Sequence, residues 1–379
     1  MRRLLIFNSG VFVYGAEKCL LNLVSVLQGN YEITVILPKN GPLCELLRQR
    51  HCKVIIYPLA ILSAADSPFW GLHYLLLFLV NIPSFIIYAV LLRYDCFISN
   101  TLLLIPPLFA SKICGRKFIW FIREFFPLRA VNRLAAFLAR NLSDRVVCMS
   151  RNISVEVFGA SSGMAPRIRV IHEPLPIILP DKEKIDPLRR ELNITQGSIV
   201  VSLIARVHPL KGQLEFLRAY AEILKRYNVT VLLAGDLSSQ TLRSRAYAHS
   251  LRQFIQEGGL SGNVRLLGYR QDAAELLGLS DICVFPYLRN EPFGLSIQEA
   301  ICAGKPVFYY SNPGLEEAIG CFRDKEAFHL SAESLEQGFL RVLSREPIAA
   351  QDRSGIAFLS ESTYREEVNG LLRGVFSFE

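Results

Sequence analysis

Apolar residues in the first half of the chain fall into short continuous runs separated by polar turns. Such runs are typical of strands buried on both faces of a parallel sheet. Between them, apolar positions recur at helical spacing, as at Leu20, Leu23, Val24 and Leu27. The pattern predicts strands at Leu4–Phe7, Ile33–Leu37, Lys53–Ile56, Cys96–Ser99, Lys117–Phe121 and Arg145–Met149, and helices starting near Ala16 and at Leu43–Arg50.

The same alternation restarts after a proline-rich, charged stretch, Pro166–Pro187, which we interpret as the seam between two domains. Strands are expected at Ile199–Ile204, Thr230–Leu233, Val264–Leu267, Ile282–Phe285 and Pro306–Tyr309, with helices at Leu214–Arg226, Leu242–Glu257, Ala273–Gly278, Ser296–Ala303 and Ser362–Arg373. Strands alternating with helices indicate two doubly wound, Rossmann-like α/β domains, which leave a central cleft between them. We expect domains at 1–175 and 176–361, and a C-terminal helix in 362–379 that packs back on the first domain.

The longest apolar segment is Trp70–Leu92. It is long enough to cross a membrane, which takes roughly 20 residues. Asn81 and Pro83 interrupt it, however, and Asn81–Ser84 has the composition of a break. We therefore expect two shorter helices, in the core or at a membrane interface, with a true span as the alternative.

Charge is distributed unevenly. Residues 1–180 hold 19 Lys and Arg against 9 Asp and Glu, of totals of 42 and 34 in the 379-residue chain. Attraction to an anionic membrane surface is one interpretation, nucleic-acid binding another and a plain solvated surface a third. The neighbouring apolar segments favour the membrane, and no nucleic-acid partner is expected. The nine cysteines show no zinc-type spacing, which indicates reduced thiols in the cytoplasm.

The most informative segment reads Glu-Pro-Phe-Gly-Leu-Ser-Ile-Gln-Glu, from Glu291 to Glu299. It follows a predicted strand and opens a predicted helix. Gly294 would let a ligand approach the backbone closely, and the first N–H groups of the helix attract anions. Carboxylates on both sides suit hydroxyl groups. A nucleotide-sugar carries both kinds of group.

Three elements in the second half occur in the order found in family 4 retaining glycosyltransferases of the two-domain GT-B architecture, which this half resembles. They are Ile204–Gly212, Gly235-Asp236 followed by Arg265–Tyr269, and Glu291–Glu299. The first half resembles the family more moderately, through Tyr14-Gly15-Ala16-Glu17, Ile98–Thr101 and Ile119–Glu124. The resemblance implies an N-terminal acceptor domain and a C-terminal nucleotide-sugar domain.

The resemblance also implies roles for individual residues. Arg206 and Lys211 would hold the leaving diphosphate, and Glu291 would lie near the donor sugar. Glu299 would accept hydrogen bonds from the ribose. Further donor-binding candidates are Gly15, Gly268, Tyr269, Phe293, Gly294, Leu295 and Ser296. The family works without a metal, and no Asp-x-Asp motif stands out in the expected active-site loops.

Plainer interpretations remain open for several of these residues. Ser296 and Glu299 also form a capping-box pattern, in which Glu299 would fold back to Ser296. Arg206 and Lys211 could be ordinary surface residues, Glu291 a solvated loop acid and Gly15 an ordinary turn glycine. His208, beside the phosphate loop, is expected to be a loop residue rather than a catalyst.

The first half departs from the family. Many members have a histidine in the acceptor domain that touches the donor sugar, but Trp120-Phe121-Ile122 offers no imidazole at the matching place. The resemblance leaves Asn100, Thr101, Arg123 and Glu124 as the candidates for sugar or acceptor contact. The usual Asn-Gly before the linker is replaced by His172-Glu173-Pro174.

The sequence thus predicts a metal-independent, retaining hexosyltransferase without a cofactor. Its donor would be a nucleotide-diphosphate sugar, and its acceptor a hydroxyl of a surface glycan or lipid-linked carrier. We expect it in the cytoplasm, peripherally on the membrane face. Two alternatives share the architecture: a nucleotide-sugar 2-epimerase, and a non-catalytic donor-binding subunit.

Overall fold

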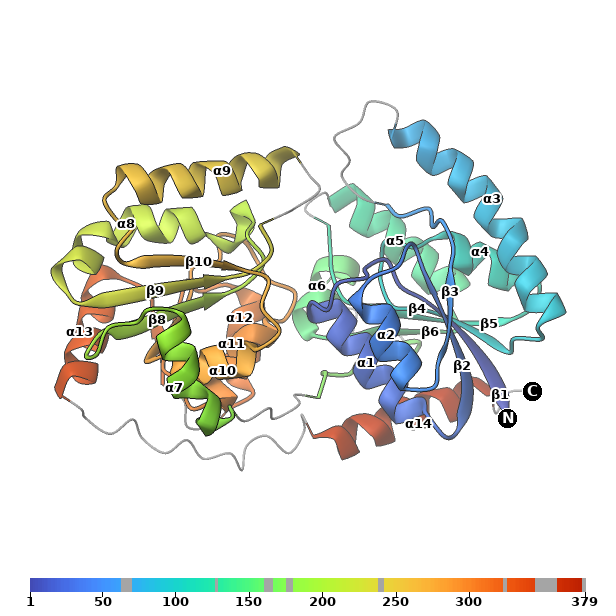
Figure 1. The fold of residues 1–379 in the computed structure, drawn as a ribbon. Coiled ribbons are helices and arrows are strands. Elements are labelled where there is room, and N and C mark those ends of the chain that lie inside the picture. Colours follow the sequence, from blue (N-terminus) through green and yellow to red (C-terminus); the bar gives the residue numbers. More distant parts are fainter. Residues whose placement is uncertain are drawn as a thin grey trace. The chain divides into compact units, whose positions relative to one another are not determined.

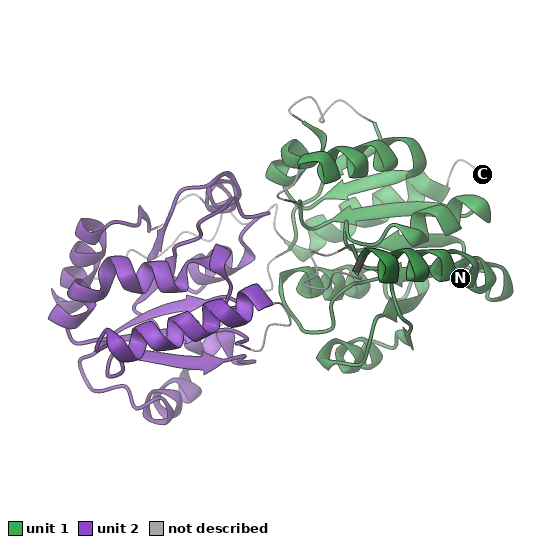
Figure 2. Ribbon diagram, turned by 90° about the horizontal axis from the view of Figure 1, so that it is seen from above, with its two compact units in different colours: residues 1–174, 357–379 green, residues 175–356 purple. Residues whose placement is uncertain are grey.

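The computed structural model describes residues 1–62, 70–126, 129–159, 166–174, 180–237, 242–322, 326–344 and 360–376. The chain divides into two compact units (Figure 2). Unit 1 comprises Met1–Pro174 and Ala357–Glu379, and unit 2 comprises Leu175–Ile356. Each unit is a parallel sheet covered by helices (Figure 1), so the two doubly wound α/β domains predicted from the sequence are confirmed. The central cleft between them stays a prediction.

Unit 1 is built on a seven-stranded sheet of order β3-β2-β1-β4-β5-β6-β7, in which every pair is parallel. Its strands are β1 (Arg2–Phe7), β2 (Tyr31–Leu37), β3 (Lys53–Ile56), β4 (Cys96–Ser99), β5 (Lys117–Ile122), β6 (Arg145–Cys148) and β7 (Ile168–Val170). Its helices are α1 (Gly15–Leu27), α2 (Pro42–Gln49), α3 (Trp70–Leu91), α4 (Pro106–Ile113), α5 (Arg129–Leu142), α6 (Arg151–Phe158) and α14 (Glu361–Phe376).

Unit 2 is built on a six-stranded parallel sheet of order β10-β9-β8-β11-β12-β13. Its strands are β8 (Ile199–Ile204), β9 (Val229–Ala234), β10 (Val264–Gly268), β11 (Ile282–Phe285), β12 (Val307–Tyr309) and β13 (Ala327–His329). Its helices are α7 (Lys182–Glu191), the 3-10 helix η2 (Pro209–Lys211), α8 (Gln213–Arg226), α9 (Leu242–Glu257), α10 (Ala273–Leu279), α11 (Leu295–Cys302), α12 (Pro313–Gly320) and α13 (Ala332–Ser344).

The C-terminal helix α14 returns to unit 1 and packs against α1 (Figure 1). Its apolar side, which includes Tyr364, Val368 and Leu372, joins the core cluster formed by β1, β2 and α1. Residues more than 180 positions apart in the sequence thereby close one core, as the bond between Tyr364 and Glu173 shows.

One sequence prediction about local structure is wrong. The expected break at Asn81–Ser84 is absent, because α3 continues through Pro83 as a single helix. Pro83 removes only one backbone donor. Asn81 does not end the helix, because its side chain accepts from the N–H of Ala60 at 2.9 Å and donates to the carbonyl of Pro58 at 2.9 Å.

The stretch Pro166–Pro187, which the sequence predicts as the seam, contains secondary structure at both of its ends. Strand β7 lies in its first part, and the charged run forms the first turn of α7. Asp181 caps that helix by accepting from the N–H of Glu183 at 3.1 Å. The two units therefore divide inside this stretch, between Pro174 and Leu175.

Candidate functional site

The loops at the carboxyl ends of the strands of unit 2 meet one another closely. A Cβ atom on Gly235, which follows β9, would lie 2.0 Å from the carbonyl oxygen of Ala205, which follows β8. The N–H of Gly235 donates to the carbonyl of Gly268, at the end of β10, at 2.8 Å. Ligands of doubly wound folds bind at this edge of the sheet.

The loop after β8 is shaped by Gly212 and His208. Gly212 has a φ of 70°, and a Cβ there would lie 2.0 Å from the carbonyl oxygen of Pro286, so only glycine lets this loop approach the end of β11. His208 caps η2, because its Nδ1 accepts from the N–H of Leu210 at 3.1 Å. Together they place Lys211 beside the loop that follows β11.

Helix α11 begins at Leu295 with Gly294 as its N-cap, at a φ of 77°. Phe293 is fully buried, so its side chain anchors the turn in the core. The capping-box interpretation of Ser296 and Glu299 is wrong, because Ser296 lies inside the helix and its hydroxyl bonds to the hydroxyl of Tyr287 at 3.0 Å. The first N–H groups of α11 and the Gly294 backbone therefore define one wall of the site.

Lys211 and Glu291 form the centre of the unit 2 site. The Lys211 Nζ lies 2.8 Å from the Glu291 Oε2, and both side chains are mostly buried. The same Nζ lies 3.8 Å from the centre of the Tyr287 ring. Burial lowers the pKa of Lys211, but the Glu291 carboxylate and Tyr287 together outweigh it, and the pKa lies above its ordinary value. The cation is therefore fixed and fully charged at neutral pH.

Cationic side chains also act on His208, three residues before Lys211. The pKa of His208 is lowered to about 4, first by burial and then by Arg206, Arg243 and Lys211. Three cationic side chains thus disfavour the charged form of His208, which stays neutral at neutral pH. Fixed cations beside the N-terminus of a helix form a setting for a diphosphate.

Two residues of this site were missed by the sequence reasoning. Tyr287 faces Lys211, Glu291 and Ser296, and its position just after β11 is the signal that could have identified it. Arg243 lies in the first turn of α9, and nothing in the local sequence distinguishes it from other surface arginines.

Three further unit 2 candidates lie on segments that follow the carboxyl ends of strands. Glu299 lies on α11, close enough to Tyr287 to raise its pKa. Tyr269 is partly exposed just after β10, and Arg206 is exposed at the end of β8. These positions lie at the same sheet edge. The ligand roles of all these residues stay predictions.

In unit 1, the candidates Asn100 and Arg123 belong to a buried network. Asn100 donates to the side chain of Asn8 at 2.9 Å and accepts from Arg123 Nε at 3.2 Å. Arg123 pairs with Glu173, which also accepts from the hydroxyl of Tyr364 at 3.1 Å. The side chains of Arg123 and Glu173 are each 1% exposed. The structure thus gives Asn100 and Arg123 internal partners, and sugar contact by them stays a prediction.

The buried Thr101 and the partly buried Glu124 form a second contact, just after β4 and β5. The Thr101 hydroxyl bonds to the Glu124 carboxylate, which also accepts from the N–H of Leu102 at 2.6 Å. Burial raises the pKa of Glu124 to about 7, although both hydrogen bonds oppose the rise. Among the four acceptor candidates, Glu124 is the one that titrates near neutral pH.

Gly15 is the first residue of α1, and Glu17 completes the helix start by accepting from the N–H of Tyr14 at 3.3 Å. Phe121, near which the resemblance would place a histidine, is buried in the core of unit 1. In the part of the chain that the structure describes, no cluster of His, Cys, Asp and Glu side chains could hold a metal ion.

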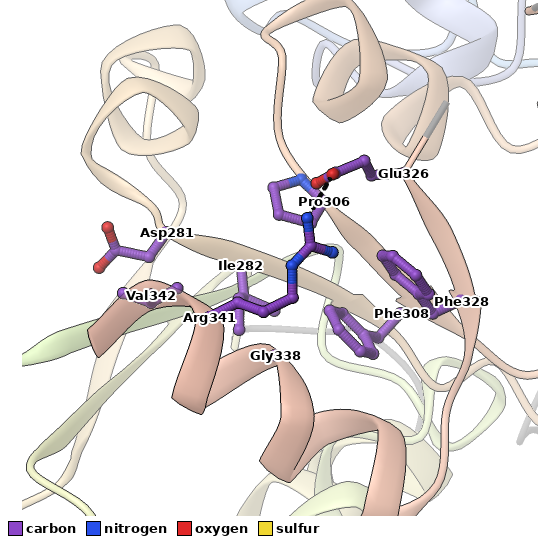
Figure 3. Close-up of a pocket in the computed structure, with 9 residues that line it drawn as sticks. All are labelled: Asp281, Ile282, Pro306, Phe308, Glu326, Phe328, Gly338, Arg341 and Val342. Carbon is purple, nitrogen blue, oxygen red and sulfur yellow. Dashed lines mark hydrogen bonds and ion pairs between the residues drawn. The ribbon is translucent and has the colours of Figure 1, made fainter. Parts of the chain in front are cut away.

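A cavity of about 150 Å³ lies elsewhere in unit 2 (Figure 3). Its wall includes Ile282 at the start of β11, Pro306 just before β12, and Glu326 just before β13. Arg341 points across it and pairs with Glu326 at 2.7 Å. The cavity therefore lies at the amino ends of the strands, at the opposite edge of the sheet from Lys211 and Glu291.

Solved structures share this architecture over the whole chain. Anabaena Alr3699/HepE in complex with UDP and glucose superposes with a TM-score of 0.79 at 22% identity, covering 98% of this chain and 99% of that one. WaaG, a glycosyltransferase involved in lipopolysaccharide biosynthesis, gives a TM-score of 0.65 at 13% identity, covering 98% and 99%. The fold is thus that of two parallel-sheet α/β domains with GT-B glycosyltransferases as structural neighbours.

Sequence comparisons give a more specific match for unit 2. The family model "Glycosyl transferases group 1" matches residues 184–354, which lie within unit 2. D-inositol 3-phosphate glycosyltransferase of Corynebacterium efficiens is 32% identical over 136 residues, which is 35% of this chain and 31% of that protein. An uncharacterized glycosyltransferase of Methanocaldococcus jannaschii is 27% identical over 190 residues, covering 48% and 46%. These matches span a third to a half of the relatives' length.

Proposed function

We propose that this protein is a retaining hexosyltransferase that moves a sugar from a nucleotide-diphosphate sugar to a hydroxyl of a glycan or lipid-linked acceptor. The observation that carries the proposal is the Lys211–Glu291 pair, held against Tyr287 beside the Gly294 turn and α11. The group 1 domain match over residues 184–354 supports a sugar-transfer reaction. The UDP and glucose in the Anabaena structure make UDP-glucose the first donor to test.

The chemistry follows from the charges. The acceptor oxygen bonds to the anomeric carbon as the bond from that carbon to the diphosphate oxygen breaks. The acceptor proton passes to the departing phosphate on the same face of the sugar, which retains the anomeric configuration. Lys211 and Arg206 stabilise the negative charge that develops on the diphosphate, and prearranged charge of this kind contributes most of the rate enhancement in many enzymes. Because these cations and the α11 N–H groups supply the charge, we propose that no metal is needed.

The experiment compares Lys211→Met with Lys225→Met, a lysine on the exposed side of α8 whose surface pair with Glu222 is 3.2 Å long. Release of nucleoside diphosphate from UDP-, GDP- and ADP-sugars is measured, after a thermal-shift screen identifies the donor. Loss of one such cation is expected to slow turnover about 10²–10³-fold, whereas Lys225→Met should behave as the unaltered protein. Equal rates for both variants would contradict the proposal.

The same assay separates the alternatives. A 2-epimerase converts the donor sugar in the absence of acceptor, and no nucleoside diphosphate accumulates. A donor-binding subunit shows the thermal shift but no release. Undiminished activity after treatment with EDTA is the expected result for a metal-independent enzyme, and its loss would overturn that part of the proposal.

We also propose that the protein works in the cytoplasm, peripherally on the membrane. The basic, apolar first half of the chain supports this placement. Fractionation of cells should recover the protein with membranes at low salt and release part of it at high salt, because screening weakens attraction between surface charges.

A further inference from the structure

Helix α3 presents a continuous apolar face that the rest of unit 1 does not cover. It is 22 residues long and contains no Asp, Glu, Lys or Arg. Large apolar side chains spaced along one side of the helix are more than half exposed: Leu72, Leu75, Leu76, Leu79, Val80, Ile87, Val90 and Leu91. Exposed apolar patches of this extent mark interaction surfaces in folded proteins.

The opposite side of α3 is fixed to unit 1. Asn81 and Phe85 are fully buried, and the centre of the Phe85 ring lies 4.7 Å from that of Phe7 in the interior strand β1. The Ser84 hydroxyl bonds to that of Tyr57 at 2.7 Å. The helix is long and apolar enough to cross a membrane, with 17% of its most apolar stretch buried. Crossing would expose Asn81 to lipid and remove Phe85 from the core, so the structure favours a helix that lies on a surface.

The neighbouring helices extend this face. The connections from β3 through β6 all run in one direction along the sheet, and right-handed crossovers then place α3, α4 and α5 on the same side (Figure 1). Helix α4 contacts both of its neighbours. Ile113 on α4, and Leu134 and Phe137 on α5, are also more than half exposed. We call these three helices together the α3–α5 face.

The charge of the α3–α5 face has one sign. None of the three helices contains an Asp or Glu, whereas Lys112, Arg129, Arg133 and Arg140 lie on α4 and α5. Lys112 pairs with Asp144, which follows α5, at 2.8 Å. Arg129 and Arg133 are exposed beside Leu134.

The combination of exposed arginines and exposed apolar side chains distinguishes a membrane from a second copy of the chain as the partner of this face. Exposed arginines next to exposed leucines and a phenylalanine match a surface with anionic headgroups above hydrocarbon. Two copies of the face would bring like charges together, which disfavours self-association. We infer that the α3–α5 face is a docking surface for an anionic lipid bilayer, in which α3 lies in the headgroup region without crossing it. The inference gives the membrane placement proposed above a defined surface, and it does not depend on the sugar-transfer reaction.

The test measures binding of the purified full chain to sedimenting vesicles of phosphatidylcholine, alone or mixed with phosphatidylglycerol. The variant Leu75→Gln/Leu79→Gln removes two exposed leucines from α3. Leu340→Gln/Leu343→Gln makes the same changes at two leucines of α13 in unit 2, which are equally exposed. The α3 variant should bind mixed vesicles at least about tenfold more weakly, and the α13 variant should bind as the unaltered protein. Equal binding by both variants would overturn the inference.

A separate variant tests how much the positive charge contributes to vesicle binding. Arg133→Gln should weaken binding to mixed vesicles about fivefold and leave the weaker binding to pure phosphatidylcholine unchanged. Equal loss on both vesicle types would refute the anionic-lipid assignment.

Two further outcomes also count against the inference. Retention in vesicles after alkaline carbonate washing would show a spanning helix. A dimer in vesicle-free buffer that becomes a monomer in the Leu75→Gln/Leu79→Gln variant, without vesicle binding by either form, would show a second copy as the occupant. Donor turnover measured in vesicle-free buffer should be the same for both double variants, so failure of lipid binding and failure of the proposed reaction are distinguishable.

Discussion

Arg123→Met tests whether the buried ion pair with Glu173 holds unit 1 together. The two side chains are each 1% exposed, and Glu173 also joins β7 to α14 through Tyr364. The substitution keeps most of the side-chain volume but leaves Glu173 buried without its cation. Burial raises the pKa of Glu173, and Arg123 is the largest influence that opposes the rise.

The expected loss is large. Breaking a buried pair by removing one partner costs about 3–5 kcal/mol. In a domain of this size each kcal/mol lowers Tm by about 2–4 °C, so the unit 1 transition should fall by roughly 10 °C. The loss should be greater at pH 7 than at pH 5. A carboxyl whose folded-state pKa is raised loses stability as the pH rises from its unfolded value through its folded one.

Calorimetry and urea titration measure this effect, with Arg365→Met as the matched control. Arg365 pairs with Glu361 on the surface of α14 at 2.7 Å, with side chains 45% and 64% exposed. Its loss should change stability by no more than about 0.5 kcal/mol. The double variant Arg123→Met/Glu173→Gln should recover part of the loss, because no buried charge remains. If Arg123→Met were no less stable than Arg365→Met, the argument that this pair organises unit 1 would fail.

Three further variants test other parts of the structure. The unaltered protein should lose stability as the pH rises from about 4.5 to about 7, because the Glu124 carboxyl is protonated more readily in the folded state. Glu124→Gln should abolish this loss. An unchanged pH profile of unfolding would contradict the burial of this carboxyl. Gly212→Ala should cost more than about 2 kcal/mol in urea titration, because strain at positive φ adds to the clash with Pro286. Gly159→Ala, at a φ of 86° with open space around it, should cost only about 1 kcal/mol, and equal losses would refute the clash. His208→Asn, which keeps a capping group, should leave turnover unchanged from pH 6 to 8, since the pKa of His208 is about 4; a lost or shifted pH profile would make His208 a participant.

Every strand predicted from local periodicity is present in the structure, with small shifts at the ends. Strands β7 and β13 were missed, and each is only three residues long. Each also carries an exposed polar residue, Arg169 or His329, and so lacks a continuous apolar run, whereas the equally short β12 is apolar and buried throughout. The interruption at Asn81 misled the prediction of α3 for a related reason. Its composition suggests a break, while its hydrogen bonds to Pro58 and Ala60 hold the helix in place.

The sequence by itself determined the fold class, the loops at the strand ends and the glycines that shape them, because burial on both faces of a sheet and positive φ angles leave local signatures. Tertiary structure decided which side chains meet. Lys211 and Glu291 are 80 positions apart, and Tyr287 joins them only because Gly212 brings the two loops together. Likewise, α3 became an exposed surface rather than a core helix because its polar and aromatic anchors all lie on one side. Sequence patterns report how much of a residue is buried, but contacts between distant residues depend on how the whole chain packs.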